Sequence, residues 1–485
     1  MKEIVILQND WHCNYFHSKI LTMNMKFSIV FLCFTFFPIF LFCQSKISTK
    51  PFQKNYQETS HDLRGDTEDT GIEKQPMRKG AGTIDTFEQG NAEGHLVDLR
   101  RKSPTHELRG VWVSTVQRVD FPSKATTDPE VLKNEWLDLL AFYKSLNLNA
   151  VIVQVRPTGD AIYPSKIVPY TKWLTGKSGK PIAGNFDLLK FMIETAHSEG
   201  IEFHAWVNPY RIIIDGDTTN LDARHPFHAH RNWVMPYGRE YLLNPGVPGV
   251  WKYLSLVVEE IVKKYDIDAI HFDDYFYPYK IAGEDLPDVE AYKKYGKFFP
   301  HIDDWRRANT DSLIFNIKNV IKKNKPHVQL GVSPFAVWRN SSEDTEGSDT
   351  KAYQRCYDDL YSDVVNWMKN GWLDYVAPEV YFHIGHPLVD YEKILNWWDE
   401  HTYGTTLYIS HAIYKVNRQE KYPAWSDSEE IPRQLDLARS KSEVKGLVFF
   451  SSKWLKQNAL GVTDALKNYF FYVPAELPNV YFGKF

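Results

Sequence analysis

Three carboxylic acids in this chain lie where they could cleave a glycosidic bond. Asp273 and Asp274 end one apolar segment, and Glu379 follows Pro378 at the end of another. Glycosidic cleavage usually needs two carboxyl groups, one to protonate the leaving oxygen and one to act as nucleophile or to activate water. Charge repulsion between adjacent acids raises the pKa of one of them, which suits a general acid. We therefore predict Asp273, Asp274 and Glu379 as catalytic residues. The structural alternative is that one aspartate binds backbone amides and Glu379 pairs with an interior arginine.

Basic, polar and aromatic side chains near the ends of similar segments are candidate substrate contacts. Guanidinium groups bind carboxylates or substrate oxygens, and aromatic faces stack on sugar rings. The predicted contacts are Arg109, Arg156, Asp160, His204, Asn208, Tyr210, Arg211, Tyr275, Tyr277, Trp338 and Tyr381. Two of them have a structural alternative, because His204 also fits a core histidine and Asp160 also fits an acid that orders the loop around Arg156.

Histidine clusters raise the alternative of metal-dependent chemistry. His225, His228 and His230 lie close together, and His383 and His386 are three positions apart. All of these histidines are expected in loops, without HExxH or the inward-facing HxH on a strand that is typical of metal-dependent barrels. We expect no catalytic metal and no cofactor. A metal-dependent amidohydrolase remains an alternative that chelators would test.

The elements that must position these residues alternate between short and long segments. The expected strands are 110–114, 150–156, 202–208, 268–273, 328–333, 375–381, 406–411 and 446–451, with helical patterns at 129–146, 186–199, 249–265, 304–323 and 353–370. Strands that alternate with helices form parallel βαβ units, and eight such units close into a barrel. A doubly wound open sheet is the alternative, but no Gly-rich phosphate loop follows the first strand. The predicted fold is α/β, a (β/α)8 TIM barrel with long loops after the third strand (212–249) and the fourth (279–303).

The order of residues within the strands predicts which side chains face the barrel interior. In the second strand Val151, Val153 and Val155 share one face, and Gln154 and Arg156 share the other. The third, fourth and sixth strands repeat this alternation. Aliphatic faces suit the helix layer, so the polar faces point inward and gather at the C-terminal mouth, where barrel enzymes place their active sites.

Composition and the N-terminal sequence define the remaining organisation. The net charge of −4 gives no basic surface for nucleic acid, and the 15% aromatic content fits a glycan binder. Residues 27–43 are apolar, follow Lys26 and precede a polar stretch, as in a secretory signal. We predict a signal or targeting segment at 1–45 with translation starting at Met25 or Met23, a polar linker at 46–104, the barrel at 105–470 and a C-terminal tail at 471–485. The expected location is exported, in the periplasm or cell envelope or secreted. A lipoprotein is disfavoured because Cys43 follows Leu41-Phe42.

Five motifs together resemble the glycosyl hydrolase-like 10 family. They are ELRGVWV (107–113), QVRPTGDAIYPS (154–165), AWVNPYR (205–211), HFDDYFYP (271–278) and DYVAPEVY (374–381). The resemblance implies a (β/α)8 barrel that acts on bacterial cell-wall glycans, including peptidoglycan strands stripped of stem peptides, with Asp273 and Asp274 at the catalytic site. It does not carry Glu379, because the family pattern is expected to have Gln and Trp in place of Glu379 and Phe382.

The predicted function is therefore a glycoside hydrolase that uses carboxylate acid/base chemistry on a cell-envelope polysaccharide. The alternative is a non-catalytic glycan-binding barrel that keeps the aromatic residues but lacks a working acid pair. The expected partner is the polysaccharide, with no nucleic acid and no stable membrane span after signal cleavage.

Overall fold

Eight parallel strands form a closed barrel in the structure, a computed structural model that describes residues 103–417 and 422–478. The strands are β1 (Leu108–Val113), β2 (Ala150–Arg156), β3 (Glu202–Val207), β7 (Ala269–Phe272), β8 (Gln329–Val332), β9 (Tyr375–Val376), β10 (Thr406–His411) and β11 (Val444–Phe449). Pairing of β1 with β11 closes the ring. The predicted (β/α)8 fold is confirmed.

The sixth barrel strand, β9, is shorter than the sequence predicts. Regular pairing covers two residues, because Pro378 has no N–H to donate to the ladder. Pairing resumes at Glu379, which bridges Phe335 on one side and Ser410 on the other. The interruption leaves Glu379 anchored by its backbone at the end of the strand.

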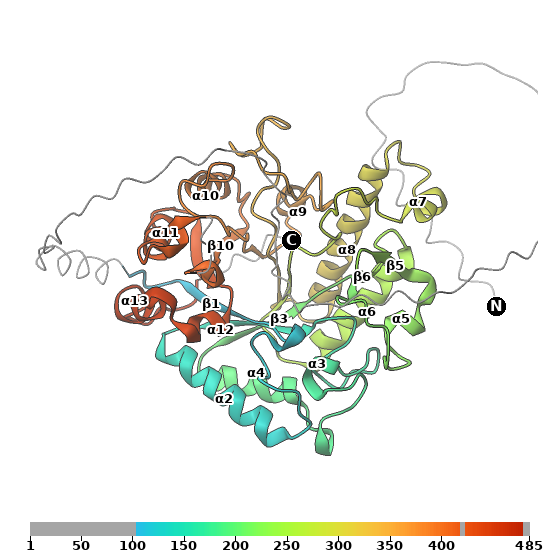
Figure 1. The fold of residues 1–485 in the computed structure, drawn as a ribbon, viewed down its shortest axis with the longest axis horizontal. Coiled ribbons are helices and arrows are strands. Elements are labelled where there is room, and N and C mark those ends of the chain that lie inside the picture. Colours follow the sequence, from blue (N-terminus) through green and yellow to red (C-terminus); the bar gives the residue numbers. More distant parts are fainter. Residues whose placement is uncertain (1–102, 418–421, 479–485) are drawn as a thin grey trace, which may run out of the picture. The chain divides into compact units, whose positions relative to one another are not determined.

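Helices surround the barrel between its strands (Figure 1). The longer ones are α2 (Pro129–Ser145), α4 (Leu188–Ser198), α6 (Pro248–Lys264), α8 (Ile302–Asn324), α10 (Tyr391–Glu400) and α11 (Glu430–Arg439). The start of α2 shows why they begin where they do, since Asp128 accepts a hydrogen bond from the Glu130 amide and Pro129 occupies the first turn. Four of the five expected helices occur within a few residues of their predicted bounds.

The fifth expected helix, at 353–370, is wrong over its first half. Only α9 (Val364–Lys369) is helical, and it begins after Asp363, which accepts a hydrogen bond from the Asn366 amide. The residues before it form turns in which Arg355 donates from its backbone and its guanidinium to Asp359. A side chain that satisfies the backbone locally competes with helix formation.

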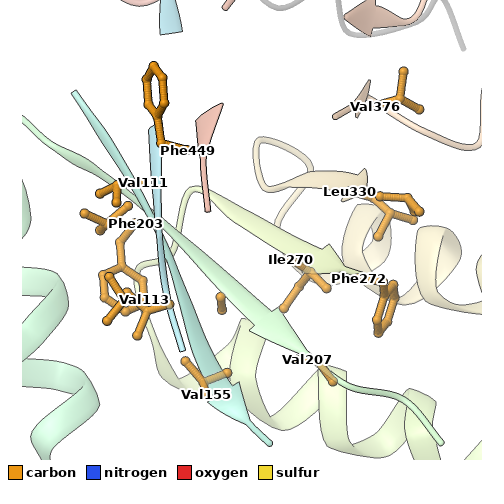
Figure 2. Close-up of a cluster of buried hydrophobic side chains, with 14 of the residues drawn as sticks. Val111, Val113, Val155, Phe203, Val207, Ile270, Phe272, Leu330, Val376 and Phe449 are labelled. Atoms are coloured by element: carbon orange, nitrogen blue, oxygen red, sulfur yellow. The ribbon is translucent and has the colours of Figure 1, made fainter. Parts of the chain in front are cut away.

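Aliphatic side chains on the outer face of the strands form the main core with the helices. Figure 2 shows Val155, Phe203 and Ile270 projecting from neighbouring strands into this layer. A separate cluster fills the barrel interior and includes Trp112, Trp206, Tyr375, Tyr408 and Val448. The predicted alternation is confirmed for the aliphatic set.

Two insertions beyond the strand ends pack against each other. The loop after β3 forms a small sheet in the order β4-β6-β5, from β4 (Arg211–Ile213), β5 (Val234–Tyr237) and β6 (Glu240–Leu243), which the sequence did not predict. The loop after β7 carries α7 (Val289–Tyr295). The Tyr237 hydroxyl accepts a hydrogen bond of 2.8 Å from the Ile281 amide and so joins the two insertions, which lie together on one side of the barrel (Figure 1).

Residues 471–478, part of the segment predicted as a C-terminal tail, cover the N-terminal end of the barrel. The amide of Glu107 donates to the carbonyl of Glu476 over 2.9 Å, and the Glu476 amide donates to Thr105 over 2.8 Å. Leu477 packs against the interior cluster. The predicted signal segment and nearly all of the linker lie outside the described residues. No helix within 103–417 and 422–478 is long and apolar enough to cross a membrane.

Candidate active site

Asp273 lies at the C-terminal end of β7 and is held by donors from β3. Its side chain is 2% exposed. Its Oδ2 atom accepts hydrogen bonds from the indole Nε1 of Trp206 over 3.1 Å and from the amide of Asn208. Burial raises the pKa of Asp273 to about 6, although the Arg211 charge and these two donors act in the opposite direction. Asp273 is therefore the acid with the best stabilised anion in this region.

Asp274 is equally buried, with fewer stabilising contacts. It is 2% exposed, and its Oδ2 atom accepts a hydrogen bond from the hydroxyl of Tyr279. Burial and the negative charge of Asp273 raise the pKa of Asp274 to about 7. Two adjacent buried carboxyl groups cannot both ionise easily, so this pair shares protons near neutral pH.

Glu379 is a third carboxyl group whose pKa is affected by the charges of the two aspartates. It is partly exposed, and its backbone amide donates to the carbonyl of Pro334 over 2.9 Å. Burial, followed by the charges of Asp274 and Asp273, raises the pKa of Glu379 well above its usual range. The three predicted acids thus lie together at the C-terminal end of the barrel, although the aspartates follow β7 and Glu379 follows β9.

Arg211 supplies positive charge beside this cluster. It begins β4, and its guanidinium lies over the Tyr275 ring with 4.8 Å to the centroid. Its charge lowers the pKa of Asp273 and of Asp274 against the effect of burial. Arg211, Asn208 and Tyr275 are therefore predicted site residues that the structure brings to the acids.

Aromatic rings from successive loops surround the acids. The rings of Tyr275 and Tyr279 stack with 5.3 Å between their centroids. The ring centroids of Tyr279 and Phe335 are 6.5 Å apart, and those of Phe335 and Phe382 are 6.1 Å apart. These four residues, which we call the aromatic arc, are all partly exposed. On another side Tyr381 contacts Tyr414 at 5.8 Å and Phe450 at 6.2 Å, and its pKa is raised by burial and then by the charge of Glu379.

Sequence reasoning missed Trp206, Tyr279, Phe335 and Phe382 as site residues. Two of them carried a usable signal, because Trp206 shares the inward face of its strand with Asn208, and Tyr279 lies within the aromatic run after Asp274. Phe335 and Phe382 lie in loops, where strand alternation predicts nothing.

Two predicted contacts lie below the mouth or at the opposite end of the barrel. Arg109 is near the start of β1, where its Nε donates to Glu107 over 2.7 Å and its Nη1 donates to the Val473 carbonyl over 2.7 Å. His204 is buried inside the barrel between Glu202 and Tyr375. This corrects their predicted placement at the mouth. Both residues lie in the first half of their strands. A buried position on the strand therefore does not bring them to the C-terminal end of the barrel.

Arg156 and Asp160 lie on the side of the barrel that faces the helices. A bulge shifts the register so that Gln154 pairs with Trp206 but Arg156 pairs with Val207, whose side chain belongs to the outer core. The predicted inward orientation of Arg156 is therefore wrong, since one extra residue reverses the alternation. Asp160 orders its own loop by accepting hydrogen bonds from the amide and hydroxyl of Thr158 at 3.1 and 3.0 Å.

Three predicted aromatic contacts are buried in the core instead. Tyr210 and Tyr277 are fully buried, and Tyr277 packs edge-on against Tyr361 at 5.0 Å. Trp338 donates to Asp363 over 3.2 Å and lies parallel to Trp397 at 6.2 Å. The correction has a simple cause, because large apolar rings in long loops gain more free energy by packing under the loop than by remaining in water.

The histidine clusters have structural contacts. His225 caps α5 (Pro226–Ala229), and its Nε2 atom lies 2.9 Å from the Thr158 carbonyl. The rings of His383 and His386 contact each other at 5.0 Å. Across residues 103–417 and 422–478, no group of three or more His, Cys, Asp or Glu side chains has an arrangement that could hold a metal ion.

A closed parallel barrel with interacting carboxyl groups at its C-terminal end defines a class, the (β/α)8 barrels with an acid cluster at the mouth. The sequence profile of the glycosyl hydrolase-like 10 family matches residues 107–427, and the chain belongs to this family.

Relatives of the chain are named as glycosyl hydrolases. Glycosyl hydrolase YngK of Bacillus subtilis is 45% identical over 378 residues, which are 77% of this chain and 74% of that protein. Glycosyl hydrolase DigH of Escherichia coli K12 is 37% identical over 372 residues, 72% of this chain and 84% of that protein. Among solved structures, the PgaB (BpsB) glycoside hydrolase domain of Bordetella bronchiseptica matches 75% of this chain and 99% of that chain, with a TM-score of 0.48 and 13% identity.

Proposed function

We propose that this protein hydrolyses glycosidic bonds in a polysaccharide of the bacterial cell envelope. The observation that carries the proposal is that Asp273, Asp274 and Glu379 lie together at the C-terminal end of the barrel, where the charges of both aspartates raise the pKa of Glu379. Carboxyl groups whose environments differ can take different protonation states at the same pH, which is what acid/base cleavage of a glycoside needs.

The contacts favour different roles for the three acids. Asp273 has two hydrogen-bond donors and the nearby Arg211 charge, so it acts as the carboxylate that attacks the anomeric carbon or activates water. Burial and the charges of both aspartates raise the pKa of Glu379 well above its usual range, so we assign it the role of proton donor to the leaving oxygen. Asp274 acts through its charge, which raises the pKa of Glu379.

The aromatic residues and the family support the proposed substrate class. The aromatic arc and Tyr381 offer partly exposed rings near the acids that can stack on sugars. Peptidoglycan strands stripped of stem peptides are the first substrate to test. Export through the signal at 1–45 would bring the protein to them, and mass spectrometry of the mature N-terminus tests that step.

The experiment incubates the full chain with stripped peptidoglycan and with a panel of other envelope polysaccharides, and identifies the new ends. Asp273→Asn and Glu379→Gln should each lower kcat by roughly 10²-fold or more while glycan binding is retained. Asp160→Asn is the matched control, since it changes a buried acid outside the cluster and keeps the acceptor oxygen.

The outcomes separate the alternatives. Retained binding with no turnover of any glycan by the unmodified protein would establish the glycan-binding barrel and refute the hydrolase. Activity abolished by chelators would establish a metal-dependent hydrolase.

A further inference from the structure

A chain of hydrogen bonds runs through the barrel interior beneath Asp273. It starts at Glu202, whose Oε2 atom is 3.0 Å from His204 Nε2, and continues from His204 Nδ1 to the Tyr375 hydroxyl over 2.8 Å. The same hydroxyl is 2.7 Å from His271 Nδ1, and His271 Nε2 is 2.9 Å from the Ser333 hydroxyl. Strands β3, β7 and β9 contribute to this chain together with Ser333, which directly follows β8, and we call it the interior relay.

One arrangement of protons satisfies every group of the relay with both histidines neutral. The Glu202 carboxylate only accepts, so His204 donates from Nε2 and accepts at Nδ1 from the Tyr375 hydroxyl. The Tyr375 oxygen then accepts from Nδ1–H of His271, and His271 Nε2 accepts from Ser333. Burial lowers the pKa of His271 well below its usual value, which fits a neutral ring. The relay therefore fixes the tautomer and the ring orientation of His271.

His271 is connected to Asp273 by two routes. It lies two positions before Asp273 on the inward face of β7. Its ring also meets Trp112 edge-on at 4.7 Å, and Trp112 meets Trp206 edge-on at 4.8 Å. Trp206 in turn donates its indole N–H to Asp273. The orientation of the His271 ring therefore affects the Trp112 ring, which in turn packs against Trp206, the donor to Asp273.

Tyr375 has the room that this role needs because of the glycine opposite it. A Cβ atom on Gly331 would lie 1.9 Å from the Tyr375 ring, so only glycine leaves space for the ring to cross the interior and reach both histidines.

We propose that Tyr375 and His271 are positioning residues, which hold the Trp112 and Trp206 rings so that Trp206 keeps its hydrogen bond to Asp273. The positioning of Trp206 by these residues does not depend on the proposed function. The effect of this positioning on kcat rests on the proposed function.

Tyr375→Phe in the full chain tests the relay by removing one hydroxyl and keeping the ring. In protein labelled with 15N-histidine and 15N-tryptophan, the His271 ring signals should move to a different tautomer pattern. The Trp206 indole N–H should exchange faster with solvent by roughly tenfold, because the Trp206 ring is no longer held against Asp273, the acceptor of its hydrogen bond. The signals are assigned with His271→Gln and Trp206→Phe variants.

Tyr408→Phe is the matched control. Its ring lies 5.2 Å from that of Tyr375 in the same interior cluster, and its hydroxyl is not part of the relay. It should leave the His271 and Trp206 signals in place. On a turned-over glycan, Tyr375→Phe should lower kcat by roughly tenfold with KM within about twofold, and Tyr408→Phe should do neither.

The results that would overturn the inference do not depend on activity. Unchanged His271 and Trp206 signals in folded Tyr375→Phe protein would refute it, as would equal changes in the Tyr408→Phe control. If Tyr375→Phe does not fold, Ser333→Ala removes the other end of the His271 contacts, and unchanged signals there refute the relay. Shifted signals in a protein whose unmodified form turns over no glycan support the relay and refute the proposed function.

Discussion

The indole nitrogen of Trp206 lies 3.1 Å from Oδ2 of Asp273, so a residue inside the barrel donates to the acid at its mouth. This hydrogen bond stabilises the ionised form of Asp273, which burial alone would disfavour. It links the protonation state of the acid to the packing of the barrel interior.

Loss of this donor should be visible in the titration of Asp273. In Trp206→Phe the pKa of Asp273 should rise above about 6, and the acidic limb of the pH–kcat/KM profile should move to higher pH. kcat/KM at neutral pH should fall by roughly tenfold or more, since a donor to a charged group is lost. An unmoved acidic limb would show that Asp273 is not the titrating base.

The raised pKa values predict how stability depends on pH. Asp273 and Asp274 have pKa values of about 6 and about 7 in the folded protein, above the value of 3.8 for the free side chain. At these two groups the folded state binds more protons than the unfolded state, so their contribution to the free energy of unfolding falls as pH rises from about 4 to about 7.

Asp274→Asn removes one of these groups. The variant should be more stable than the unmodified protein at pH 7, by roughly 1–3 kcal/mol, and the two should converge near pH 4. Denaturant unfolding at both pH values measures this. If Asp274→Asn gives no gain in stability over the unmodified protein at pH 7, or a smaller gain than at pH 4, the raised pKa of Asp274 is contradicted.

The far end of the barrel should affect stability without affecting chemistry. The Glu107 carboxylate is buried and pairs with Arg109 at 2.7 Å and with Arg439 at 2.7 Å. Glu107→Gln leaves a buried guanidinium without its counter-charge, which should cost about 3 kcal/mol. Thermal unfolding should report the loss while kcat and KM stay unchanged, and the exposed Glu476→Gln should change neither. A large fall in kcat in Glu107→Gln would show that Arg109 affects the active site after all.

The aromatic arc should determine affinity for the glycan. The side chains of Phe335 and Phe382 are partly exposed and carry no group that could transfer a proton, so Phe335→Ala and Phe382→Ala should raise KM by about 2- to 10-fold with little change in kcat. Tyr403→Ala, at an exposed ring that pairs with Lys369, is the control. Equal KM values for all three variants would show that the arc does not bind substrate.

The sequence alone determined the eight barrel strands, most of the longer helices and the inward face of most strands. A period of two in β2, β3 and β7 is a local property of the chain, and burying one apolar face leaves a single orientation for the other. Asp273, Asn208 and Glu379 could therefore be placed at the mouth from their position in the strands.

Only the tertiary structure decided what lies beyond that alternation. One extra residue near Val155 turned Arg156 toward the helices, and depth along the strand separated His204 and Arg109 from the acids. The assembly of Phe335 and Phe382 and the burial of Tyr277 depend on loops, whose conformation follows from long-range packing. Contacts between segments far apart in the chain have no local period, so the sequence pattern of either segment cannot reveal them.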